Sequence, residues 1–415
     1  MRKTLPDRGR SRDQIFSDMR EMKSRDVDWQ HGRTPLYVFK ASDEIYEVGR
    51  DAYFEFFTEN ALGARRAFHS VKQMEDEVID MALGLFGAPE GAQGFITTGG
   101  TESIIQAVQT CRDWTRAQRK DSGHRGNIVA PESLHPAFNK AAKLMDLEVL
   151  RVPVGPDLRA DVAAMEAMIN DDTIMLAGSA PSFPYGVIDP IADIGRLAER
   201  KGLWFHVDAC VGGYLAPFVR MIGRNIPEFD FRVSAVTSIS ADLHKFGFCP
   251  KPASTVFYRD AVKAEYHNFY FSNWPNGPFL TPTIVGTRPA GGVAGAWATF
   301  QFLGVEGYKQ VASELMGLID AYKAGIRSIE GLEILGEPHL SIVAYSSPEI
   351  DIFRVAEVMA EKGWLPGLVQ KPKAIHRMMS MIHAPSLDEY LADVKAAVGV
   401  VRQSAPKASE IKATY

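Results

Sequence analysis

Short strand-like segments alternate with helical segments between residues 94 and 208. The expected strands are 94–98, 127–130, 147–154, 173–177 and 203–208, and the expected helices between them are 102–119, 136–145, 161–169 and 191–201. This alternation is typical of a mostly parallel sheet with helices on both faces. Ligands of such sheets bind beyond the carboxyl ends of the strands. We therefore expect an α/β fold whose functional residues follow strands.

The flanking segments have a different character. Residues 1–65 form an N-terminal extension, with aromatic residues near Tyr37 and at 53–57, and we expect helices that pack on the main domain or on a partner subunit. A helical pattern at 71–86 ends at Gly87 and Pro89. After a helix at 295–329, the sequence predicts strands at 332–335, 340–345 and 374–382 and helices at 352–362 and 387–402. We predict three parts: the extension 1–65, a large domain 66–295, and a linker helix with a small C-terminal α/β domain 296–415.

Composition excludes several classes of protein. The 415 residues are 46% hydrophobic, enough for a large core, and the net charge of −5 does not favour a nucleic-acid partner. No run of about 18 apolar residues predicts a membrane span, and the polar N-terminus lacks the apolar segment of a signal peptide. Three scattered cysteines without metal-like spacing, Cys111, Cys210 and Cys249, fit a reducing cytoplasm and no metal site.

Lys245 is the most informative single residue. It follows His244 and a stretch of small and apolar residues at 233–240, where a surface charge is unexpected. Upstream, Asp208 ends an otherwise apolar strand, either as a simple cap of the next turn or as a functional acid. A lysine and a buried carboxylate at neighbouring strand ends are the pair that pyridoxal 5'-phosphate (PLP) needs. The lysine forms a Schiff base with its aldehyde, and the acid pairs with its pyridine nitrogen. The sequence therefore predicts a PLP site.

The segment 97–103 joins a predicted strand to a predicted helix. Gly99 and Gly100 let the backbone approach an anion, and a helix N-terminus offers free N–H groups to it. The alternative is a glycine turn in which Thr101 caps the helix and no ligand binds. Lys245 downstream favours the phosphate site.

Four further residues are candidates. His135 follows a predicted strand and is either a ring that stacks on a flat cofactor or an ordinary loop residue. His244 could reach the same phosphate as the glycine segment. Arg288, in the glycine-rich loop 286–292, suits an anion in its own or a neighbouring subunit, and Lys251 is either a second cation near the pocket or a solvated charge.

Together these segments resemble the sphingosine-1-phosphate lyase family, within the PLP-dependent group II decarboxylase-like enzymes of fold type I. The resemblance extends from about residue 71 to residue 402. It rests on the segments 98–103, 135–142, 183–190, 206–213, 229–232, 236–245 and 286–289. The run 237–245 and the Gly-Thr-Arg-Pro segment at 286–289 point to the lyase branch in particular.

The resemblance implies an aspartate-aminotransferase-like fold and a homodimer with active sites at the subunit interface. The implied catalytic residues are Lys245 for the Schiff base, Asp208 at the pyridine nitrogen and His135 on the ring. The implied phosphate ligands are Gly99, Gly100, Thr101, His244 and, from the other subunit, Thr287. The candidate substrate-binding residues are Lys251, Asn60, Tyr37 and Arg288.

The implied reaction is a retro-aldol cleavage of a carbon–carbon bond. A phosphorylated sphingoid base, or a related β-hydroxy amine, would yield a long-chain aldehyde and phosphoethanolamine or the corresponding amine. The family typically has a histidine after Asn-x-Leu, whereas this chain has Gly63 after 60–62, and the region of Tyr37 matches loosely. The alternatives are a PLP-dependent amino-acid decarboxylase and a cofactor-binding protein without activity.

Overall fold

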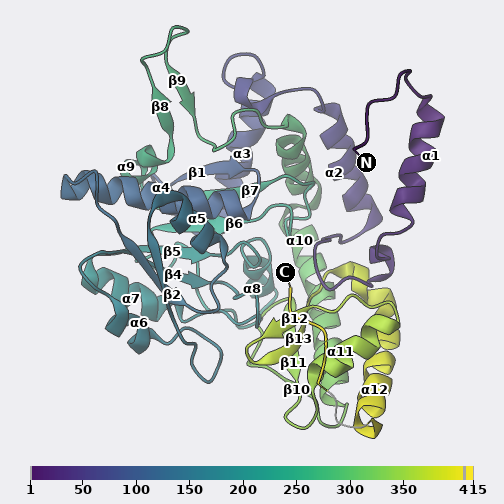
Figure 1. The fold of residues 1–415 in the computed structure, drawn as a ribbon. Helices are drawn as coiled ribbons and strands as arrows, with labels where there is room; N and C mark the ends of the chain where they lie inside the picture. The colour runs from purple at the N-terminus through teal and green to yellow at the C-terminus, as the bar shows by residue number, and fades with distance from the viewer. Residues whose placement is uncertain (1, 405–407, 415) are drawn as a thin grey trace.

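A seven-stranded sheet forms the centre of the computed structural model, which describes residues 2–404 and 408–414 (Figure 1). The strand order is β1-β7-β6-β5-β4-β2-β3, and β7 runs antiparallel to both of its neighbours whereas the other pairs are parallel. The expected mostly parallel sheet is confirmed. The strands are β1 (Gln93–Thr97), β2 (Asn127–Pro131), β3 (Glu148–Val152), β4 (Thr173–Ser179), β5 (Trp204–Asp208), β6 (Ser238–Ala241) and β7 (Ser254–Tyr258).

Helices cover both faces of this sheet, so successive residues of a strand enter different cores. In β5, Trp204 packs in the smaller core with α4 and α5, and Phe205 packs in the larger core on the other face. Of the small and apolar stretch 233–240, only the end belongs to a strand: β6 begins at Ser238, and Val233 and Val236 lie in hydrogen-bonded turns before it. The helices are α3 (His69–Leu85), α4 (Gly100–Arg119), α5 (Ala137–Met145), α6 (Val162–Met168), α7 (Ile191–Lys201) and α8 (Ala216–Met221).

A second, four-stranded antiparallel sheet lies in the C-terminal region (Figure 1). The predicted strand at 374–382 is too long, because 381–386 forms a 3-10 turn. The strand β12 was not expected, and the long helix changes direction at Gly304, where φ is 53°. The elements are α10 (Ala290–Arg327), β10 (Glu333–Ile334), β11 (Ile342–Ser346), α11 (Ile352–Glu361), β12 (Leu368–Gln370), β13 (Lys373–Met378), η4 (Met381–Ser386) and α12 (Leu387–Gln403).

The N-terminal segment begins with α1 (Arg12–Lys23), which buries no residue and lies apart from the sheet in Figure 1, and continues with α2 (Asp43–Glu55), which packs along α10. Between them lies η1 (Trp29–His31), and η2 (Ala61–Gly63) follows α2. The hairpin of β8 (Phe269–Phe271) and β9 (Phe279–Thr281) projects from the body after α9 (Ala261–Ala264) and η3 (Glu265–His267).

Across residues 2–404 and 408–414, no helix is long and apolar enough to cross a bilayer. The division of the chain at residues 65 and 295 stays a prediction.

Gly186 lies in a connection of the large sheet that contacts the four-stranded sheet. Its φ is +74°, and an added Cβ would lie 2.0 Å from the carbonyl oxygen of Ile342 in β11. Gly202 also has a positive φ, +65°, but its Cβ would meet nothing within 4 Å. We expect Gly186→Ala to lower the free energy of unfolding by about 3 kcal/mol and Gly202→Ala by about 1 kcal/mol, as measured by urea denaturation. Equal losses would show that the contact with β11 does not restrict this position.

Candidate active site

Lys245 lies in a turn four residues after the end of β6, beside a cavity of about 360 Å³. The cavity is at the carboxyl ends of the strands, as the sequence predicted. It brings together Gly99, Gly100, Thr101, His135, Asp208, His244 and Lys245. Its other lining residues are Thr98, Glu102, Ile104, Ser179, Pro181, Phe183, Cys210, Val211 and Asp242.

Asp242 is the nearest charged partner of Lys245, and the sequence analysis did not identify it. The lysine Nζ lies 2.9 Å from Oδ2 of Asp242, and Oδ1 accepts a hydrogen bond of 2.5 Å from the Ser254 hydroxyl. Burial alone would lower the pKa of Lys245, but the charge and hydrogen bond of Asp242 and the nearby Cys210 and Asp208 together outweigh it, and the pKa is raised. Burial alone would raise the pKa of Asp242, but the charges of Lys245 and His244 hold it below its usual value. The available signal was its spacing, three residues before the lysine in one turn.

Asp208 ends β5 and is almost fully buried. Its Oδ1 accepts hydrogen bonds from the Cys210 N–H at 3.1 Å and from the Ser240 hydroxyl at 3.4 Å. The first of these bonds is the turn cap that the sequence offered as the simple alternative. Because only Oδ1 is used in these two bonds, the cap leaves Oδ2 for a ligand of the cavity.

The glycine segment forms the start of α4. The N-cap residue is Gly99, and no side chain caps the helix, so the alternative that Thr101 is the cap is wrong. The Glu102 carboxylate instead accepts hydrogen bonds from Thr98, through its N–H at 2.7 Å and its hydroxyl at 2.6 Å, and from the Ile284 N–H at 2.8 Å. A helix of 20 residues leaves its first N–H groups and the positive end of its dipole at the cavity wall.

Two histidines complete the walls of the cavity. His135 accepts a hydrogen bond from the Ala137 N–H at 3.2 Å and meets the ring of Phe183 edge-on at 6.4 Å between centroids. His244 accepts one from the Ala253 N–H at 3.2 Å, and its Nε2 lies 3.7 Å from Oδ2 of Asp242. Burial lowers the pKa of both histidines. A ring without charge suits His135 for contact with the face of an aromatic ligand.

Lys251 lines a neighbouring cavity of about 370 Å³, which shares His244 with the first. Its Nζ donates a hydrogen bond of 3.0 Å to the Tyr37 carbonyl and lies 5.8 Å from the centre of the Phe39 ring. Burial and the charge of Lys245 lower its pKa. Lys251 is therefore part of a pocket wall and not only a solvated charge.

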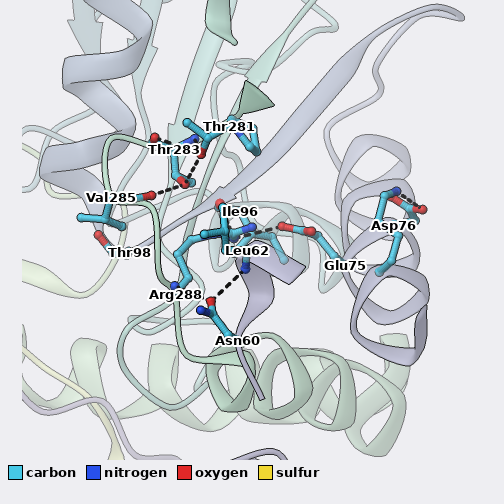
Figure 2. A network of polar contacts seen from close by, with 12 residues as sticks. Asn60, Leu62, Glu75, Asp76, Ile96, Thr98, Thr281, Thr283, Val285 and Arg288 are labelled. Carbon is cyan, nitrogen blue, oxygen red and sulfur yellow. Dashed lines mark hydrogen bonds and ion pairs between the residues drawn. The ribbon is translucent and has the colours of Figure 1, made fainter. Parts of the chain in front are cut away.

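Asn60, Thr287 and Arg288 form a separate group outside the cavity that Lys245 lines in its own chain. Figure 2 shows Asn60 and Arg288 of this group beside Glu75 and Ile96. Asn60 accepts hydrogen bonds from the N–H groups of Leu62 and Arg288 and donates one of 3.2 Å to the Thr287 hydroxyl. The Arg288 guanidinium lies 3.0 Å from the Glu75 carboxylate and donates a 3.1 Å bond to the Ile96 carbonyl. These bonds hold the 281–288 loop against α3 and β1.

Comparison with known proteins identifies the class. The pyridoxal-dependent decarboxylase conserved domain matches residues 1–347. A sphingosine-1-phosphate lyase of Oryza sativa subsp. japonica is 39% identical over 410 residues, covering 97% of this chain and 75% of the relative. The structure of a Burkholderia pseudomallei sphingosine-1-phosphate lyase matches with a TM-score of 0.91 and 33% identity, over 97% of this chain and 94% of that chain. A probable L-tyrosine/L-aspartate decarboxylase of Methanothermobacter thermautotrophicus is 32% identical over 342 residues, covering 81% of this chain and 90% of the relative.

The fold and these matches define a PLP-dependent enzyme of fold type I. Its activity is that of a PLP-dependent aldehyde-lyase. The chain belongs to the sphingosine-1-phosphate lyase family.

The residues of the cavity fit PLP. An amine, a carboxylate with one free oxygen and a helix N-terminus match the aldehyde, the pyridine nitrogen and the phosphate of that cofactor. Gly100 is tightly enclosed, since an added Cβ would lie 2.8 Å from both carboxylate oxygens of Asp242 and from the Cys210 sulfur. The close approach of backbone to Asp242 therefore requires glycine at this position.

We expect Gly100→Ala to weaken PLP binding about tenfold, because the new methyl group must displace the carboxylate that holds Lys245. Gly84→Ala is the matched control, since Gly84 lies in α3 and its Cβ would meet nothing within 4 Å. Equilibrium dialysis of the purified chain against PLP measures both affinities. Equal affinities for the two variants would contradict the tight fit at Gly100.

Proposed function

We propose that the chain cleaves a phosphorylated sphingoid base to a long-chain aldehyde and phosphoethanolamine. The observation that carries the proposal is the single cavity in which Lys245, Asp208 and the start of α4 meet, with the Lys251 cavity beside it. The similar lyases of Oryza sativa and Burkholderia pseudomallei are sphingosine-1-phosphate lyases, which agrees with this choice of substrate.

Each wall of the cavity has one role toward the cofactor in this proposal. Lys245 holds it covalently, Asp208 faces its pyridine nitrogen and His135 covers its ring. The residues at its phosphate are Gly99, Gly100, Thr101 and His244. When bound, PLP supplies an electron sink for the electron pair of the broken bond.

The bond that breaks lies between Cα, which carries the amine, and Cβ, which carries the hydroxyl. The hydroxyl loses its proton, the Cα–Cβ bond breaks to release the aldehyde, and Cα gains a proton to give phosphoethanolamine. Lys245 is placed for the last proton transfer, because its amine lines the cavity and the Asp242 carboxylate at 2.9 Å keeps that amine protonated. Asp242 also holds the lysine Nζ at one place in the cavity.

The Lys251 cavity is suited to the remaining part of the substrate. Lys251 offers a cation for the phosphate, and Tyr37 positions that cation through its carbonyl. Phe39, Tyr53 and Phe248 provide apolar wall beside it. This pairing of a cation with aromatic surface fits a phosphate joined to a hydrocarbon chain.

We also propose that the chain acts as a homodimer in the cytoplasm. Asn60, Thr287 and Arg288 lie together outside the cavity of their own chain, and in this proposal Thr287 reaches the cofactor phosphate of the partner. The exposed aromatic residues of the β8–β9 hairpin, among them Phe269 and Tyr270, give such an interface apolar surface. Three free, buried cysteines agree with a reducing compartment.

The second candidate is a PLP-dependent amino-acid decarboxylase. The archaeal decarboxylase, at 32% identity over 81% of this chain, favours it. The two reactions share the electron sink but release different products, carbon dioxide in one case and an aldehyde in the other.

Product identification by mass spectrometry tests the proposal. We expect a long-chain aldehyde and phosphoethanolamine from a phosphorylated sphingoid base, and no carbon dioxide from aromatic or acidic amino acids. Lys245→Ala is the control and should form neither product, because the cofactor loses its covalent partner. Release of carbon dioxide without aldehyde would contradict the lyase proposal and support the amino-acid decarboxylase instead.

Gly63 allows a test of phosphate recognition. It lies in η2 next to Asn60, and an added Cβ would be 3.2 Å from the Phe68 ring, which must move by a few tenths of an ångström. The family typically has a histidine here, and in the proposed dimer this group of residues faces the partner's site. We therefore expect Gly63→His to lower the KM for the phosphorylated base by about tenfold, because it adds a donor for the phosphate there. The KM for the unphosphorylated base should stay the same. An unchanged KM for both substrates would count against a role for this position.

A further inference from the structure

A row of polar side chains lies behind Asp208 on one face of the sheet. Trp204, His206 and Asp208 alternate along β5, and Ser238 and Ser240 alternate along β6. Because side chains of a strand point to opposite faces in turn, each set shares one face. The parallel register pairs His206 with Ser238 and Asp208 with Ser240, so the two sets interleave.

Hydrogen bonds connect the five side chains in sequence. The Trp204 Nε1–H donates to the Ser238 hydroxyl at 2.7 Å, and this hydroxyl lies 2.8 Å from Nδ1 of His206. On the other side of the ring, Nε2 lies 3.2 Å from the Ser240 hydroxyl, which donates to Oδ1 of Asp208 at 3.4 Å. His206, Ser238 and Ser240 are fully buried.

The two ends of this row fix its direction. An indole N–H can only donate, so of the two partners of the Ser238 hydroxyl only Nδ1 of His206 can accept its proton. An ionised carboxylate can only accept, so the proton of Ser240 goes to Asp208 and its oxygen receives a proton from Nε2. Both ends therefore assign the same neutral form of His206, with its proton on Nε2. Burial agrees, since it lowers the pKa of His206 to about 4.

We propose that Trp204, Ser238, His206 and Ser240 form a one-directional hydrogen-bond chain that positions the Asp208 carboxylate for the pyridine nitrogen of PLP. The chain and the Cys210 N–H both bind Oδ1, so that Oδ2 is presented to the cavity. His206 and its neighbours are positioning residues, because they act on the cofactor only through Asp208. The inference rests on the proposed role of Asp208.

The tautomer of His206 is the most direct test. In the purified full-length chain with 15N-labelled histidine, we expect the 15N shifts of His206 at pH 7 to show a neutral ring protonated on Nε2. His206→Asn assigns the signal by its loss. A ring protonated on Nδ1, or on both nitrogens, would overturn the direction of the chain.

Cofactor affinity tests the link to Asp208. We expect Ser240→Ala to raise the Kd for PLP about tenfold, the value of one lost hydrogen bond to a charged group. Ser346→Ala is the matched control, because Ser346 is also a buried strand serine but donates to the Lys373 carbonyl in the small domain. A Kd for Ser240→Ala equal to that of Ser346→Ala would overturn the proposal.

Two amide replacements separate the role of His206 from its packing. A glutamine can place an N–H near Nε2 and reach Ser240, whereas a shorter asparagine cannot. We expect His206→Gln to keep the wild-type Kd for PLP within about threefold, and His206→Asn to lose about tenfold, with kcat reduced more than KM is changed. Circular dichroism confirms that both variants are folded. Equal values for the two variants would contradict a donor role for Nε2.

Asp208→Asn separates this inference from the proposed function. If Asp208→Asn leaves the Kd for PLP and kcat unchanged, the role of Asp208 itself is wrong. If Asp208→Asn weakens binding whereas Ser240→Ala and His206→Asn do not, the contact with the pyridine nitrogen stands and only the chain behind it is refuted.

Discussion

The buried ion pair between Lys245 and Asp242 is the interaction on which the cavity depends. Removing two charges from water is costly unless they are paired and further hydrogen-bonded. Here the Nζ lies 2.9 Å from Oδ2, and Ser254 binds the other carboxylate oxygen. Ser254 lies on β7 and in turn contacts Ser103 of α4 at 2.8 Å between hydroxyl oxygens. The turn after β6, the strand β7 and the helix α4 therefore hold the ion pair together. A shift of any one of them would disturb the other two.

The register between β5 and β6 fixes the position of the other functional acid, Asp208. Asp208 and Ser240 are direct partners across the ladder, so a slip of one residue would turn Ser240 to the other face of the sheet. Burial on both faces prevents such a slip, because Phe205 and Val207 fill one core while Trp204 fills the other. The hydrophobic pattern of two short strands therefore fixes the position of the functional acid.

The sequence was sufficient for the parts of the fold that follow from local periodicity. Strands and helices between residues 93 and 208 appear close to their expected bounds, and the cavity gathers Lys245, Asp208, His135, His244 and the start of α4 as expected. Asp242 was missed because its spacing, three residues before Lys245, indicates an ion pair only if the segment after β6 is known to form a turn. For Arg288, the sequence could not reveal Glu75, which lies more than two hundred positions earlier and meets it through α3. The β8–β9 hairpin was missed because its aromatic strands are short and exposed, without a buried face to produce alternation.

The separation of the two groups of site residues has a physical basis. Arg288 is almost fully buried, paired with Glu75 and bonded to the end of β1, so its charge is neutralised before any substrate could use it. Its backbone N–H and the neighbouring Thr287 hydroxyl are instead bound by Asn60. Arg288 therefore anchors the loop to α3 and β1, and Asn60 holds Thr287 in place through its hydroxyl. In the proposed homodimer, this anchored loop would present the Thr287 hydroxyl to the cofactor phosphate of the partner.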